Sequence, residues 1–202
     1  MSLFEGKGLT EHKASSEVKE LFNRNVERIN PFARMDNRYI DRAEKMEFAD
    51  SHNPECNWSG KPGDSLARPN QDSPEGRVAF EKLSEFNQTG VRFQAGEPNF
   101  SKCSLASAKI DVTGKHAVDK HRACKEIAKQ WDAERPKADG SSYSAQEVKQ
   151  WAKENNLQLH HDSDMKTVRF VPAEIHGYFK HMGGVAEIKA RDEVRNGGRF
   201  DD

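Results

Sequence analysis

The chain has 202 residues, a length that allows one or two domains. Charged residues make up 32% of it and hydrophobic residues 34%, so we expect a small core and long polar surface segments. A formal net charge of −1 excludes the strong overall positive field of a highly basic nucleic-acid-binding protein.

The first part of the chain is predicted to be helical and irregular. Apolar residues recur every three or four positions over residues 14–29 and again over residues 73–86, which indicates two helices. Between them, residues 30–72 lack periodicity and are rich in turn-forming residues. We therefore expect an irregular connection there, packed around Trp58.

A domain boundary is predicted near the segment VRFQAGEPNF, residues 91–100, because it ends in turn-forming residues. On this basis residues 1–94 form an N-terminal region of helices and long loops, whose role the sequence does not reveal. Residues 95–202 form a second domain of mixed α+β structure.

The second domain begins with a short strand at residues 108–112 and a helix at residues 116–131, whose apolar residues fall on one stripe. A loop follows at residues 135–142. The sequence S-A-Q-E from Ser144 predicts a capping box that opens a further helix, which ends near Asn155.

The stretch from Lys109 to Lys129 has six basic and three acidic side chains, which indicates either a weak basic patch or an ordinary solvated helix face.

Four of the eight histidines lie within residues 157–184, LQLHHDSDMKTVRFVPAEIHGYFKHMGG. A first strand would place His161 on the same face as Leu157 and Leu159, with His160 on the opposite face. A turn at residues 162–164 and a second strand at residues 167–171 would complete a hairpin.

The hairpin leads into a short predicted helix. Pro172 suits its first turn, and Gly183-Gly184 would stop it. We expect the helices at 116–131 and 144–155 to pack behind the hairpin and this short helix.

Imidazole accepts a proton near neutral pH and also ligates divalent metals, which are the two functions that phosphodiester hydrolysis needs. The spacing of His176 and His181 is i, i+5, about 140° apart on an ideal helix. His181 must therefore lie at or beyond a distorted helix end to meet His176. Spacing alone leaves a metal site and ordinary surface or core histidines open. We interpret His116 as a surface residue and His121 as a partly buried packing residue.

The stretch LHHDSDMKTVRFVPAEIHGYFKHMGGVA resembles toxin nucleases of the HNH/endonuclease VII superfamily, also called His-Me finger or ββα-metal nucleases. It is most similar to the branch with a W-H-H or L-H-H strand followed by L-V-P-x-x-L-H-x-x-x-x-H-x-G-G. The segment GEPNFSK resembles the G-x-P-D-F-S-x-Y entry of that branch. The sequence departs from the pattern at Leu159, Asn99 and Cys103, where the branch has Trp, Asp and Tyr.

The resemblance implies an α+β fold with a C-terminal ββα-metal finger packed on helices, after a largely helical or irregular N-terminal region. It implies a metal-dependent endonuclease that hydrolyses DNA, with RNA as an open alternative. His160 and His161 match the strand pair, which divides into one general base and one metal ligand. We favour His161 as the base, although His160 can be aligned there too.

The same resemblance implies a divalent cation held by a set of four residues: His160, His176, His181 and Asp164. Mg²⁺ is expected first, with Zn²⁺, Ni²⁺ or Mn²⁺ as alternatives. Three basic residues could contact substrate phosphates or be ordinary surface charges: Lys166, Arg169 and Lys180. Because substrate must reach the histidines, we expect His160 and His161 to lie in an open cleft and to contribute little to stability.

The family further implies an interbacterial toxin that is made in the bacterial cytoplasm and delivered into target cells by a specialised secretion system, with an immunity protein and an adaptor or chaperone as partners. The N-terminus lacks a classical signal peptide, and no apolar run is long enough to span a membrane. Three cysteines without a C-x-x-C pair suggest neither a cysteine zinc site nor a disulfide framework. The alternative function is a non-catalytic nucleic-acid- or protein-binding module with a structural histidine metal site.

Overall fold

The computed structural model describes residues 39–195, so the helix predicted at residues 14–29 lies outside the described residues. The described residues belong to one compact unit. Over the described part the fold is α+β, as predicted, with helices and two small antiparallel sheets. None of the helices described is long and apolar enough to cross a membrane.

The segment expected to be irregular contains regular structure, so that prediction was wrong in part. It forms helix α2 (Arg42–His52) and strands β1 (Asn57–Trp58) and β2 (Leu66–Arg68). Asp41 caps α2 by accepting hydrogen bonds from two backbone N–H groups. Helical periodicity is hidden because Lys45, a charged residue, occupies the buried face of α2.

A four-stranded antiparallel sheet has the order β1-β2-β3-β4, with β3 (Val91–Gln94) and β4 (Glu97–Asn99) joined in a tight hairpin. Gly96 turns the chain with a φ of 80°, and its backbone lies against α2 so closely that a Cβ would be 2.4 Å from the Lys45 carbonyl oxygen. The boundary expected after residue 94 therefore falls between two paired strands of one sheet.

Helix α3 (Pro74–Ser84) confirms the second predicted helix, and Ser73 caps it. The four-stranded sheet packs with α3 and with part of the second half of the chain in one apolar cluster, which includes Phe93, Phe100 and Phe179. Trp58 packs edge-on against Phe93, with ring centroids 5.1 Å apart.

The second sheet has three antiparallel strands in the order β5-β7-β6: β5 (Ala106–Lys109), β6 (Leu157–His161) and β7 (Thr167–Pro172). The predicted helices are present as α4 (His116–Glu134) and α5 (Ala145–Glu154). The capping box is confirmed, because Ser144 and Glu147 exchange side-chain-to-backbone hydrogen bonds.

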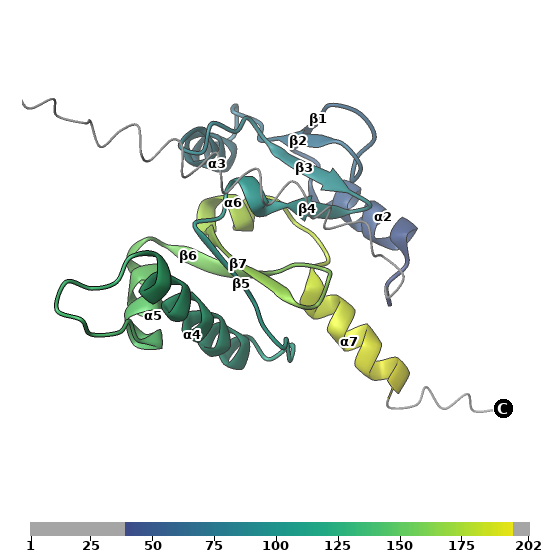
Figure 1. Cartoon of the computed structure of the whole chain (residues 1–202). Helices are drawn as coiled ribbons and strands as arrows, with labels where there is room; N and C mark the ends of the chain where they lie inside the picture. The colour runs from purple at the N-terminus through teal and green to yellow at the C-terminus, as the bar shows by residue number, and fades with distance from the viewer. Residues whose placement is uncertain (1–38, 196–202) are drawn as a thin grey trace, which may run out of the picture. The chain divides into compact units, whose positions relative to one another are not determined.

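The three-stranded sheet lies between two layers (Figure 1). Helices α4 and α5 cover one face and share an apolar core with it, which includes Ile127, Val148 and Phe170. The short 3₁₀ helix η1 (Phe100–Lys102) and helix α6 (Ala173–Tyr178) lie on the other side. The two strand histidines therefore face different layers.

Helix α6 ends at Tyr178, and a further helix, α7 (Gly184–Arg195), begins where the sequence predicts a stop. Gly184 starts α7 because its backbone packs against the end of β6. A Cβ at this position would lie 2.3 Å from the Asp162 carbonyl oxygen. The Gly-Gly pair thus allows a close approach between α7 and the β6–β7 turn.

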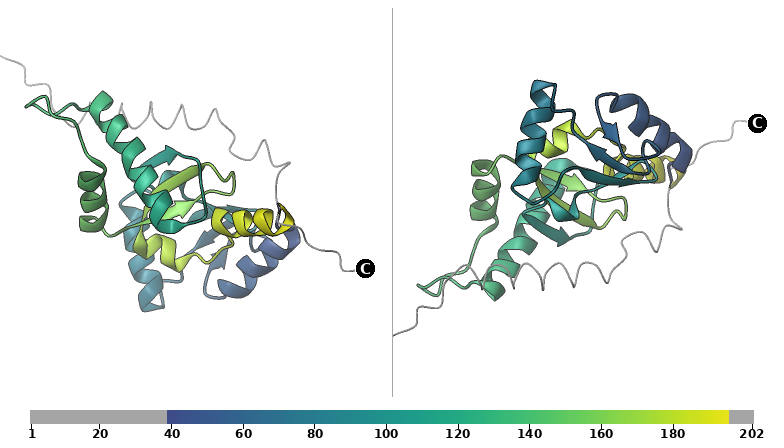
Figure 2. Two further views of the ribbon diagram at one scale, coloured as in Figure 1. Left: turned by 90° about the horizontal axis from the view of Figure 1, so that it is seen from below. Right: turned by 90° about the horizontal axis from the view of Figure 1, so that it is seen from above.

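A buried ion-pair network ties α2 to α7, which lie side by side in both views of Figure 2. The Lys45 ammonium, fully buried, contacts the carboxylates of Glu97 on β4 and Glu187 on α7. Glu187 also accepts hydrogen bonds from the backbone N–H groups of Tyr39 and Ile40, at 2.7 and 3.3 Å. Ser163 in the β6–β7 turn donates to Glu97, so the network reaches the histidine hairpin.

Candidate active site

Three histidines converge at the junction of the hairpin and α6. His160 comes from β6, His176 from α6, and His181 from the segment after α6. One ring nitrogen from each lies within 4.8 Å of the others, an arrangement that could hold a metal ion. The i, i+5 pair meets as predicted, because His181 lies beyond the end of the helix.

Hydrogen bonds fix which ring nitrogens face the centre of this histidine triad. His181 Nδ1 lies 2.9 Å from the Phe179 carbonyl oxygen, so Nδ1 carries the proton and donates it. His160 Nε2 lies 3.4 Å from the Asp162 carboxylate. The remaining nitrogens, His160 Nδ1 and His181 Nε2, face one another at 3.2 Å. With both rings neutral, two lone pairs point together, and a cation between them would relieve the repulsion.

The triad fits a small divalent cation. Nitrogens bound to a tetrahedral ion at about 2.0–2.1 Å stand about 3.3–3.4 Å apart, close to the separation of His160 and His181. Burial, reinforced by the neighbouring histidines, lowers the pKa of His176 to about 4 and holds that of His160 well below its usual range. Burial also lowers the pKa of His181. Neutral imidazoles are the form that binds metal.

A buried carboxylate and an arginine support His160 from behind. Arg169 on β7 pairs with Asp162 through its Nε and a terminal nitrogen, at 2.9–3.0 Å. Burial raises the pKa of Asp162 to about 6, although the Arg169 charge opposes the shift. Arg169 thus neutralises the carboxylate that contacts His160. The Arg169 side chain is only 12% exposed.

His161 faces the opposite layer, as strand alternation predicts. Its Nε2 lies 3.2 Å from the carboxylate of Asp119, in the first turn of α4. Burial lowers the pKa of His161, and the Asp119 charge opposes that effect. A charge on His161 in turn lowers the pKa of His160 and of His176.

The expected open cleft at the strand histidines is a wrong prediction. His160 is 4% exposed and His161 is 5% exposed, because each packs under a covering element. Phe100 of η1 packs edge-on over the His160 ring, with centroids 4.8 Å apart. His176 and His181 are partly exposed, so solvent reaches the triad from the α6 side. Loss of either strand histidine would therefore affect stability as well as chemistry.

Asp164, expected as a fourth ligand, is not among the triad. Its carboxylate accepts hydrogen bonds from the backbone N–H groups of Lys166 and Thr167 and from the Thr167 hydroxyl, at 2.6–2.9 Å. These contacts hold the β6–β7 turn. Asp162, two residues earlier, is the carboxylate that approaches His160 of the triad.

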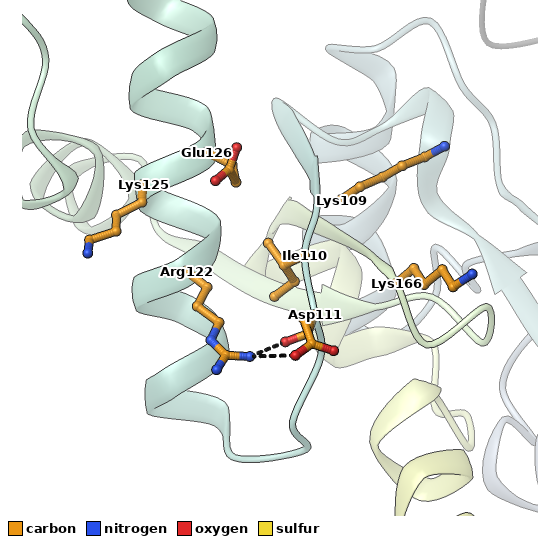
Figure 3. Close-up of a pocket in the computed structure, with 7 residues that line it drawn as sticks. All are labelled: Lys109, Ile110, Asp111, Arg122, Lys125, Glu126 and Lys166. Carbon is orange, nitrogen blue, oxygen red and sulfur yellow. Dashed lines mark hydrogen bonds and ion pairs between the residues drawn. The ribbon is translucent and has the colours of Figure 1, made fainter.

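The three predicted phosphate contacts have different surroundings. Arg169 forms an ion pair with Asp162. Lys180 is exposed beside the triad, and its charge lowers the pKa of His176 and His181. Lys166 lies at a hollow bordered by β5, α4 and the β6–β7 turn. Figure 3 shows Lys109 and Lys166 extending to one side of this hollow, while Lys125 points away and Arg122 is bound to Asp111.

Of the two histidines of α4, His121 differs from its expected character and His116 does not. His121, interpreted as a packing residue, is exposed. His116 is exposed as expected, but its ring centroid lies 6.0 Å from that of His161. Sequence reasoning also missed Asp119. A polar residue on the buried stripe of a predicted helix was the available signal, and its partner, 42 residues away, was not visible.

Residues 90–183 match the Colicin-DNase family. This family is described as the DNase/tRNase domain of colicin-like bacteriocin. The match covers less than half of the 202 residues and includes the whole histidine hairpin, the triad and Asp119. It supports a nuclease toxin domain of the HNH type for this part of the chain. No curated protein matches the chain.

Proposed function

We propose that the protein is a metal-dependent endonuclease that hydrolyses phosphodiester bonds in DNA. The observation that carries this proposal is the facing of His160 Nδ1 and His181 Nε2 at 3.2 Å beside His176, within a segment that matches a nuclease family. In each of these two rings the other nitrogen already has a partner: His160 Nε2 lies beside Asp162, and His181 Nδ1 donates to the Phe179 carbonyl. Such a site is built to receive a cation rather than to form a hydrogen bond between the rings.

A divalent cation at the triad would polarise the scissile phosphate and stabilise the leaving oxygen. Three imidazoles are softer ligands than Mg²⁺ prefers and suit Zn²⁺ or Ni²⁺ better, which argues against the Mg²⁺ expected from the resemblance. Three protein ligands leave at least one position open for substrate or water, as catalytic sites do and closed structural sites do not.

The remaining residues would divide the work of hydrolysis. His161 accepts the proton of the attacking water as the general base. Asp162 and Arg169 keep the His160 ring in the orientation that aims Nδ1 at the cation. Lys180, exposed beside His176 and His181, contacts the substrate phosphate. Lys166 and Lys109 extend a weak, salt-sensitive contact to the nucleic-acid backbone away from the site.

The biological role we propose is that of an antagonistic toxin aimed at competing bacteria. The family description names colicin-like bacteriocins, which supports this role. It implies delivery into a target cell by a specialised secretion system, a cognate immunity protein in the producing cell, and an adaptor or chaperone for the N-terminal region. The nuclease part expected at residues 95–202 would also include the helices and strands from α2 to β3 that pack with it, and a delivery role would fall to the residues before α2.

The test is cleavage by the purified protein of plasmid DNA and, separately, of transfer RNA. We expect nicking of DNA with Zn²⁺, Ni²⁺, Mn²⁺ or Mg²⁺, and its loss on addition of EDTA. Cleavage of transfer RNA alone would move the substrate to the other activity named for the family. Failure to cut either substrate with any of the four metals, by protein shown to bind metal, would instead favour the non-catalytic binding module.

Asp162→Asn is expected to weaken metal binding by about 10–100-fold, because the carboxylate behind a ligating histidine fixes its ring. Titration calorimetry with Zn²⁺ on the folded variant would measure the change. Asp164→Asn is the matched control, since that carboxylate holds only the turn. Equal losses in the two variants would contradict the assignment of Asp162 to His160 and restore Asp164 as a ligand.

A further inference from the structure

Asp119 is a buried carboxylate held rigid before it meets His161. Its Oδ1 accepts hydrogen bonds from the backbone N–H and the hydroxyl of Thr113, at 2.8 and 2.7 Å. Its Oδ2 accepts from the backbone N–H of Gly114 at 3.0 Å and faces His161 Nε2 at 3.2 Å. The side chain is fully buried in the first turn of α4. Three donors from one loop thus fix both oxygens.

An ionised carboxylate can only accept hydrogen bonds, so the histidine nitrogen that faces it must carry a proton. Burial alone would raise the pKa of Asp119, but the hydrogen bonds from Thr113 and the proximity of His161 lower it instead. The carboxylate is therefore ionised at neutral pH. His161 then holds its proton on Nε2, and the lone pair of the neutral ring lies on Nδ1.

We propose that Asp119 is a positioning residue for the hydrolytic reaction, which fixes the tautomer and orientation of the His161 ring so that Nδ1 is the basic atom. This inference rests on the proposed role of His161 as the general base. Asp119 touches neither substrate nor metal in this assignment and acts only through His161. The loop at Thr113 and Gly114, where Gly114 adopts a φ of 75°, is the part of the fold that holds it.

The position of the pair in the fold agrees with this role. His161 directly follows the triad member His160 on β6. A His161 ring that is held rigid therefore supports a fixed geometry at His160. The exposed His116 ring, 6.0 Å from His161, shows that the pair borders the surface at the start of α4.

Nitrogen-15 NMR of the unmutated protein at pH 8 tests the tautomer directly. We expect the His161 ring to show a protonated Nε2 and an unprotonated Nδ1. A protonated Nδ1 would overturn the proposal, whatever the protein cleaves. This measurement needs no variant, so it remains decisive even where substitutions at Asp119 impair folding.

Asp119→Asn tests the consequence for the reaction. The amide can present an N–H to His161 and reverse the tautomer, a change that costs about 10⁴-fold in kcat in a serine protease dyad of similar logic. We expect kcat for plasmid cleavage to fall about 10²–10⁴-fold with KM changed less than about fivefold, and the His161 proton to move to Nδ1. An unchanged kcat, or a His161 ring that keeps its proton on Nε2, contradicts the proposal.

Thr113→Val separates positioning from packing. It removes the hydroxyl donor to Asp119 but leaves the contact with His161, so the melting temperature should fall while the His161 tautomer stays the same. Loss of the Nε2 proton in this variant would indicate that the loop, and not Asp119, sets the ring. Should His161→Gln cleave at the unmutated rate, the proposed general base fails, while the tautomer result stands on its own.

Discussion

Lys45→Met is expected to lower the free energy of unfolding by about 3–5 kcal/mol, because it removes the ammonium that contacts two buried carboxylates. Lys45 is fully buried between Glu97 and Glu187. Water cannot reach these carboxylates to compensate for the lost ammonium, so their desolvation penalty acts on the folded state alone. Urea denaturation at pH 7 followed by circular dichroism would measure the change.

Lys82→Met is the matched control for Lys45→Met. Lys82 pairs with Glu85 at 2.8 Å on the surface of α3, where ion pairs contribute about 0–1 kcal/mol. The triple variant Lys45→Met, Glu97→Gln, Glu187→Gln should recover part of the stability, since it also removes the charges of the two carboxylates that Lys45 contacts. A loss below 1 kcal/mol for Lys45→Met would mean that water enters the network. The conclusion that this ion-pair network holds α2 against α7 would then be wrong.

The same network explains why the extent of the folded unit could not be predicted from the sequence. Lys45 and Glu187 lie outside the matched residues 90–183, and Glu97 lies inside them. A lysine on the inner face of a helix looks like a break in the apolar pattern. Only the distant carboxylates make it a core residue, and a single sequence carries no sign of contacts 52 and 142 residues away.

The histidine hairpin, by contrast, could be predicted closely. Alternation along β6 separates His160 from His161, and the i, i+5 spacing requires His181 to lie beyond the helix. Both expectations are confirmed because they depend on local geometry alone. Burial of the two strand histidines could not be predicted, since Phe100 and Asp119, which cover them, come from elements 60 and 42 residues earlier in the chain.

Contacts that the sequence does not show also decide the roles of the Gly183-Gly184 pair and of Asp164. Gly183-Gly184 suggests a helix stop, but Gly184 is required for contact with the Asp162 carbonyl and starts a new helix. The resemblance predicts Asp164, and not Asp162, as a metal ligand. In the structure both Asp164 carboxylate oxygens accept hydrogen bonds from Lys166 or Thr167, and Asp162 is the carboxylate that contacts His160.

His161→Gln is expected to reduce cleavage about 10²–10⁴-fold while metal affinity stays within a few-fold, because the side chain acts as a general base and not as a ligand. Glutamine is preferred to alanine since His161 is buried, and the amide N–H can still donate to Asp119. The variant thereby keeps the buried carboxylate satisfied. Plasmid nicking rates, with zinc affinity measured on the same sample, would separate the two functions.

His176→Ala is expected to lose both metal affinity and cleavage, because His176 supplies one of three ligand nitrogens. His121→Ala is the control: that ring is exposed on α4, and its loss should leave metal affinity, cleavage and the melting temperature unchanged.

In a closed structural site, metal binding and folding are one event, so ligand loss or chelator would unfold the protein. In the catalytic site proposed here, the apolar clusters that pack around α4, α5 and α6 hold the fold without metal, and EDTA should lower the melting temperature only modestly. Unfolding of the unmutated protein by EDTA, together with no cleavage by the metal-loaded protein, would replace the nuclease assignment with a structural metal site.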